Sequence, residues 1–79
     1  MNDHKIELTN SSSKSLKLTI EPWGDEYKVP EKTKVDVFSN QKNAGKIEVE
    51  VGDGFVVVHG WGNDMWVCCG GEKIEPFTD

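Results

Sequence analysis

Arginine is absent from this 79-residue sequence, and all nine basic residues are lysine. Arginine's planar guanidinium is the usual reader of phosphates and guanine edges, so its absence, with a net charge of −5, argues against nucleic acid and anionic membrane surfaces as partners. No apolar run approaches the length of a membrane span, and the start "MNDHKIEL" lacks the basic and apolar regions of a signal peptide. We therefore expect a cytoplasmic protein.

Apolar residues are also scarce, at 35% of the chain, but they include three tryptophans, three phenylalanines and one tyrosine. Each aromatic side chain removes a large apolar area from water. A chain of this length has room for one core, so residues 1–79 are expected to form a single β domain.

Cysteine is limited to Cys68 and Cys69, and the only histidines are His4 and His59. Adjacent residues of a strand point to opposite faces, so the two thiols cannot readily share a metal ion or form a disulfide. The sequence also lacks a Walker loop, G-x-S-x-G, H-E-x-x-H and a dinucleotide fingerprint. We expect no metal, no cofactor and no catalysis.

What the sequence does contain is apolar alternation with a period of two, which indicates half-buried strands. The alternating segments are "KIELT", "SLKLTIE", "EYKV", "KVDVF", "KIEVEV", "FVVVHGW", "MWVCC" and "EKIEPF", separated by turn residues. The pattern predicts an all-β fold, a small antiparallel sandwich or barrel of seven to eight short strands. "FVVVHGW" is apolar on both faces near its start and should be a central strand. Phe38 falls on an outer face, where we expect a covering loop or a bulge that turns it inward.

The stretch "EPWGDEY" marks a corner, because Pro22 cannot donate to a strand ladder and Gly24 permits a tight turn. Trp23 is expected to fold back over the end of the sheet; the alternative is an exposed stacking platform. The run "LKLTIEPWG", followed by "EYKVP", resembles a motif of short, largely uncharacterised bacterial proteins, L-x-L-x-x-E-P-W-G. The resemblance covers residues 16–30 and implies a small β fold and a bacterial source, with no activity to transfer. Pro30-Glu31 stands where that motif has Pro-Gly.

The register of the hairpin around Asp53-Gly54 decides which face carries His59 and Trp61. A two-residue turn places both with Glu48 and Glu50, whereas a three-residue turn places both with the valines of "KIEVEV". We favour the second register. A further hairpin through "GWGND" would then bring His59 near Cys68 or Cys69, as the start of a thiolate or zinc site, although buried thiols and a hydrogen-bonded imidazole are the favoured interpretation.

Charge is distributed unevenly, with a balance of +1 over residues 1–46 and −6 over residues 47–79. This asymmetry suggests an acidic face for a basic protein partner, and solubility is the alternative explanation. The favoured hypothesis is a non-catalytic protein-binding module that masks a basic partner, as an immunity protein does; unpaired sheet edges would also allow a dimer. The alternative is a small-ligand or carbohydrate-binding sandwich that stacks its ligand on Trp23, Trp61 and Trp66. The candidate binding residues are Trp23, Tyr27, Glu48, Glu50, His59 and Trp61.

Overall fold

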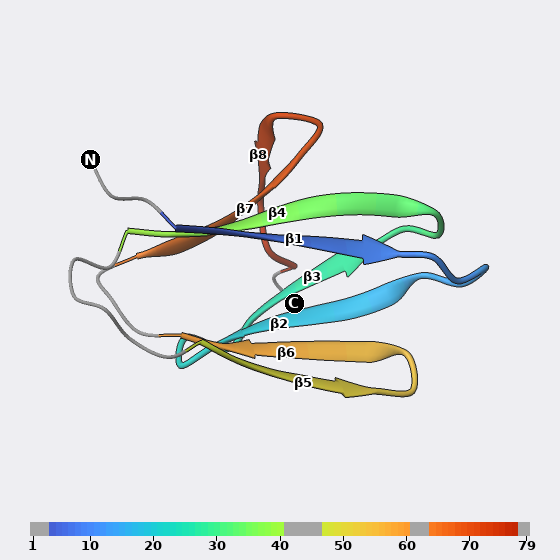
Figure 1. Ribbon diagram of the computed structural model, residues 1–79, viewed down its shortest axis with the longest axis horizontal. Coiled ribbons are helices and arrows are strands. Elements are labelled where there is room, and N and C mark those ends of the chain that lie inside the picture. Colours follow the sequence, from blue (N-terminus) through green and yellow to red (C-terminus); the bar gives the residue numbers. More distant parts are fainter. Residues whose placement is uncertain (1–3, 41–46, 61–63, 78–79) are drawn as a thin grey trace.

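The computed structural model describes residues 4–40, 47–60 and 64–77 and arranges them as eight strands (Figure 1). The strands are β1 (His4–Asn10), β2 (Leu16–Glu21), β3 (Asp25–Val29), β4 (Thr33–Ser39), β5 (Glu48–Gly52), β6 (Phe55–His59), β7 (Met65–Cys69) and β8 (Glu72–Ile74). The predicted small all-β sandwich is therefore confirmed. Within the described ranges there is no helix long and apolar enough to cross a bilayer.

Two four-stranded sheets make up the fold: sheet A in the order β1-β4-β7-β8, and sheet B in the order β3-β2-β6-β5. All neighbours within sheet A are antiparallel, but β2 and β6 of sheet B run parallel. The expectation of a wholly antiparallel arrangement is thus wrong for this one pair. β6 is an interior strand, as its apolar sequence predicts, with β2 on one side and β5 on the other.

The core lies between the two sheets and is built from alternate residues of five strands, β2, β3, β4, β6 and β7. Sheet A contributes Val35, Val37, Met65 and Val67, and sheet B contributes Leu18, Ile20, Tyr27, Val29, Val56 and Val58. β3 contacts β4 across the interface. The alternation read from the sequence therefore assigns the inner face correctly for β2, β3 and β4.

The predicted hairpin between β6 and β7 does not form, because the two strands belong to different sheets. Both edges of β6 are already occupied by β2 and β5, which leaves no edge for a third neighbour. The chain still follows sheet B at Gly60, whose N–H donates to the Glu21 carbonyl at 3.0 Å. By Met65 it has joined sheet A, where Met65 lies opposite Ser39.

The loop between β1 and β2 is organised by the side chain of Asn10, which is buried at the end of β1. Its Nδ2 donates to the carbonyl oxygens of Lys14, Val29 and Pro30 at 2.9, 3.2 and 3.0 Å. Its Oδ1 accepts hydrogen bonds from the backbone N–H and the Oγ of Ser12 at 3.1 and 2.8 Å. One amide thus ties this loop to the turn that follows β3.

Candidate functional site

The hairpin of β5 and β6 adopts the register that was not favoured from the sequence. Gly52 lies opposite Phe55 and Val51 opposite Val56, so the turn consists of Asp53 and Gly54. Gly54 has a φ of +80°, which suits a glycine in such a turn. The physical reason is visible at Gly52, where a Cβ would overlap the Phe55 ring, so the ring occupies the space that glycine leaves free.

This register puts Val49 and Val51 of β5 on the inner face of sheet B, beside the buried Val58 and Val56. Yet Val49 is 48% exposed and Val51 is 73% exposed. In Figure 1, β2 and β6 lie between β1, one of the two edge strands of sheet A, and β5. Sheet A does not reach far enough to cover β5, so the inward-facing valines remain accessible to solvent. We call residues 48–51, in which Glu48 and Glu50 alternate with these two valines, the β5 edge.

The opposite face of the β5 edge is acidic. Glu48 and Glu50 are both exposed, and neither forms an ion pair with any other described residue. Asp53, in the adjoining turn, adds a third exposed carboxylate to the same hairpin. The acidic face expected from the sequence is smaller than residues 47–79 as a whole, because Glu72 belongs to β8 of sheet A.

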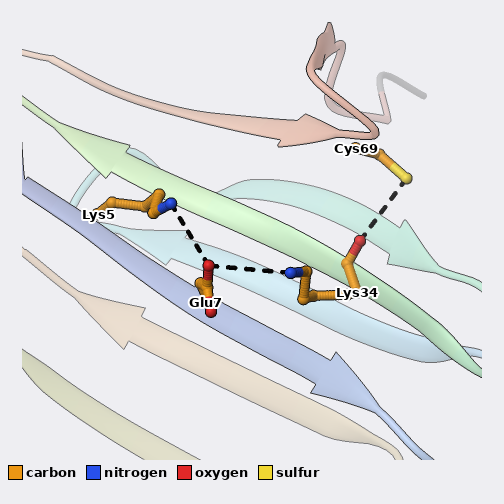
Figure 2. Close-up of polar contacts among 4 residues, drawn as sticks. All are labelled: Lys5, Glu7, Lys34 and Cys69. Carbon is orange, nitrogen blue, oxygen red and sulfur yellow. Dashed lines mark hydrogen bonds and ion pairs between the residues drawn. The ribbon is translucent and has the colours of Figure 1, made fainter.

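β1, one of the two edge strands of sheet A, has a different electrostatic character. Glu7 of β1 lies 3.4 Å from Lys5 Nζ and 3.8 Å from Lys34 Nζ, so that its charge is balanced from both sides (Figure 2). Exposed pairs of this kind contribute little to stability, but they leave no unbalanced carboxylate for a partner. β5 therefore carries carboxylates that no described lysine balances, whereas the carboxylate of β1 is balanced by two lysines.

The two remaining edges are also less accessible than β5. Phe77 forms a bridge to Glu26 of β3, and its N–H donates to the Glu26 carbonyl at 2.6 Å. β8 has only three residues, too short to pair extensively with an added strand. Among the described strands, β5 combines an edge that has no neighbouring strand with exposed valines and with glutamates that no described lysine balances.

An open groove of about 450 Å³ adjoins the Val51 end of the β5 edge. Its apolar lining comes from Leu16, Val51 and Val56, and residues 11–15 of the β1–β2 loop line it with serine hydroxyls and a lysine. The groove lies within the size range of about 300–1,000 Å³ that is typical of ligand pockets. It can receive a side chain that approaches along β5.

The two aromatic candidates of the corner have opposite environments. Trp23 lies in the turn between β2 and β3 and is 44% exposed, so the expectation that it covers the core is wrong. The turn closes through the N–H of Gly24, which donates to the Ile20 carbonyl at 2.8 Å, and the chain returns into β3, where Asp25 lies opposite Ile20. Tyr27 is only 4% exposed and belongs to the core, so it offers a partner little accessible surface.

Burial also governs the acidity of Tyr27. Removal from water raises the pKa of its hydroxyl above the ordinary value of 10.0, because the phenolate is poorly solvated there. The negative charges of Asp25, Glu75 and Asp64 raise this pKa further. Tyr27 is therefore held in its neutral form as a core residue.

His59 is not brought near either cysteine. It lies on the outer face of sheet B, opposite Glu48 on one side and Glu21 on the other. Cys68 and Cys69 belong to β7 in sheet A, where Cys69 Sγ lies 3.8 Å from the Lys34 carbonyl oxygen (Figure 2). The predicted approach of a cysteine to His59 is thus wrong, because it depended on a hairpin that does not form. The described residues contain no cluster of three or more His, Cys, Asp or Glu placed to hold a metal ion.

The remaining aromatic residues do not assemble into one stacking surface within the described part of the chain. Trp66 stacks on Phe38 of the neighbouring strand, with ring centroids 5.6 Å apart and planes inclined by 11°. This cross-strand pair, in regular register, replaces the covering loop or bulge expected for Phe38. Trp23 belongs to a turn of sheet B, and Trp61 lies outside the described residues.

The valines of the β5 edge were missed as site residues, because their alternation is the same as that of core valines. They are accessible because β5 is an edge strand whose inner face is left uncovered, and the alternation in the sequence does not encode that placement. Comparisons with known proteins found no matching family model, no matching curated protein and no matching solved structure.

Proposed function

We propose that this protein is a non-catalytic binding module that recognises a basic protein through the β5 edge. The observation that carries the proposal is the exposure of Val49 and Val51 beside Glu48 and Glu50, which form no ion pair within the described part of the chain. Exposed apolar side chains provide area that binding can bury, while free carboxylates attract and orient a cationic partner. Of the sequence-derived candidates, Glu48 and Glu50 belong to this surface, with His59 adjoining Glu48 on the outer face.

The net charge of −5 supports the same class of partner. Long-range attraction accelerates the encounter of oppositely charged proteins and weakens as salt is added. In the version of the proposal that we favour, the module is cytoplasmic and masks a basic enzyme of a bacterial cell, as an immunity protein does. The partner's own activity would then identify the biological role.

The experiment is a comparison of partner capture by three forms of the tagged protein. The first is wild type, the second carries Glu48→Lys and Glu50→Lys, and the third carries Glu31→Lys and Glu72→Lys. Both double variants change the net charge equally, but Glu31 and Glu72 are exposed residues outside the β5–β6 hairpin. The partner should be retained by wild type and by the control variant and lost from the β5 variant. The same ranking should be reproduced with the purified partner.

Two results would contradict the proposal. Equal loss of the partner from both double variants would mean that net charge alone governs the association. Equal retention by all three forms would place the binding surface elsewhere. The exposed Trp23 then becomes the residue to follow, because it is the feature that favours the small-ligand alternative; its fluorescence should shift when a carbohydrate binds.

A further inference from the structure

The backbone of β5 has hydrogen-bonding groups that its own sheet does not use. A two-residue turn closes on a hydrogen-bonded pair, and such pairs alternate with non-hydrogen-bonded pairs along an antiparallel ladder. The register Gly52 opposite Phe55 therefore directs the backbone groups of Glu48, Glu50 and Gly52 toward β6. The N–H and C=O groups of Val49 and Val51 point the other way, to the free edge of sheet B.

We propose that the basic partner binds by adding one extended segment to β5 as an antiparallel fifth strand of sheet B. This inference rests on the proposed function and specifies how the partner is held. The backbone groups of Val49 and Val51 would supply the hydrogen bonds that hold the added strand. Recognition by strand addition combines such main-chain bonds, which give affinity, with side-chain contacts, which give selectivity.

The pleat of the sheet determines the residue pattern of the added strand. Residues directly opposite each other in a ladder place their side chains on the same face. Segment residues opposite Val49 and Val51 must therefore be apolar, because they lie over the uncovered inner face. Residues opposite Glu48 and Glu50 should be lysine or arginine, which can form cross-strand ion pairs. The expected segment alternates basic and apolar residues.

The groove beside Val51 offers the added strand one further apolar contact. An apolar side chain of the segment, lying beyond its partner at Val51, can enter the space lined by Leu16, Val51 and Val56. The added strand would thus bury the valines that sheet A leaves uncovered.

A second copy of this chain is a less suitable occupant of the same edge. Antiparallel pairing of two β5 strands about a two-fold axis would place the glutamates of one copy opposite those of the other. Like charges directly opposite each other destabilise a ladder. The glutamates therefore disfavour self-association while they favour a basic segment.

The test uses a synthetic heptapeptide of alternating lysine and valine and two N-methylated forms of it. Binding to the intact protein is measured at low salt by calorimetry and by backbone amide shifts. In the proposed geometry the peptide's valines lie opposite Val49 and Val51, so their N–H groups point to β5 and those of the lysines point to solvent. Methylation of the valine nitrogens should abolish binding, whereas methylation of the lysine nitrogens should change the affinity by less than about three-fold.

Hydrogen exchange provides a second readout within the protein. The amides of Val49 and Val51 should become protected when the unmodified peptide binds, because they then donate to its carbonyl groups. The variant with Glu48→Lys and Glu50→Lys should bind the peptide about ten-fold or more weakly, and the Glu31→Lys, Glu72→Lys control should lose less.

Equal binding of all three peptides, with sensitivity to Glu48 and Glu50, would overturn strand addition but leave the charge-based proposal standing. Peptide binding that leaves hydrogen exchange at the Val49 and Val51 amides unchanged would also overturn strand addition and leave the charge-based proposal standing. Absence of binding by any peptide at millimolar concentration would also overturn strand addition, and the partner-capture experiment would still decide the proposed function on its own.

Discussion

Replacement of Asn10 is the most direct test of how the β1–β2 loop is held. This one side chain makes five hydrogen bonds, to Ser12, Lys14, Val29 and Pro30. The bond to the Val29 carbonyl is buried and links residues 19 positions apart in the sequence. Asn10→Ala removes all of these bonds and leaves the Val29 carbonyl oxygen without this donor.

The expected loss follows from the cost of unsatisfied groups. A buried acceptor without its partner costs about 1–3 kcal/mol, and the remaining bonds to a partly exposed loop contribute about 1 kcal/mol together. We therefore expect the free energy of unfolding to fall by about 2–4 kcal/mol, which is a large share of the ~4–12 kcal/mol typical for a domain of this length. The corresponding decrease in Tm is about 10–20 °C.

Asn10→Asp is a sharper variant, because it keeps the shape but replaces the donating amide with an oxygen that faces three carbonyl groups. It should destabilise the protein at least as much as Asn10→Ala does at neutral pH. Urea denaturation followed by tryptophan fluorescence measures both variants, with Ser13→Ala as the control, since Ser13 is exposed and its side chain has no hydrogen bond to any described residue. Losses below about 1 kcal/mol for both Asn10 variants would refute the reasoning.

Three further predictions concern the core and the hairpin. Because the pKa of Tyr27 is raised on folding, the unfolded chain loses the phenolic proton first, and the free energy of unfolding should fall as pH rises above about 10. Tyr27→Phe should flatten this decline in urea titrations between pH 8 and 11. A decline of unchanged slope in the variant would contradict the prediction. Gly52→Ala should lower the unfolding free energy by about 1–3 kcal/mol, because its Cβ would displace the Phe55 ring; a neutral effect in thermal unfolding would show that the ring moves freely. Val58→Ala, fully buried, should cost about 2–3 kcal/mol, against less than about 0.5 kcal/mol for the exposed Val51→Ala.

The sequence was sufficient to predict the strands and most of their faces, because alternation is a local property of a pleated chain. Leu18, Ile20 and Val35 alternate with polar residues, and each is buried as that alternation predicts. The topology was not predictable in the same way. Two consecutive hairpins were expected from β5 to β7, and only the first forms. β6 pairs on its other side with β2, which precedes it by more than thirty residues, and β7 pairs with β4.

The candidate site was only partly predictable for the same reason. Glu48 and Glu50 were identified from charge, which any sequence displays directly. The hairpin register depended on Phe55, whose ring was expected to join the apolar face but lies over the bare backbone of Gly52. The exposure of Val49 and Val51 depends on where sheet A ends, and that is a property of the whole fold.

The charge of the β5 edge has a second explanation, in which its glutamates serve only to keep a sheet edge from aggregating. That explanation accounts for Glu48 and Glu50 but not for valines on the uncovered inner face, where threonine would preserve the strand with less exposed apolar area. The double variant Val49→Thr, Val51→Thr separates the two. We expect its unfolding free energy to change by less than about 1 kcal/mol, while its affinity for the lysine–valine heptapeptide falls by about ten-fold. Unchanged affinity, measured by the same calorimetry, would mean that the valines contribute nothing to recognition and that the glutamates act through charge alone.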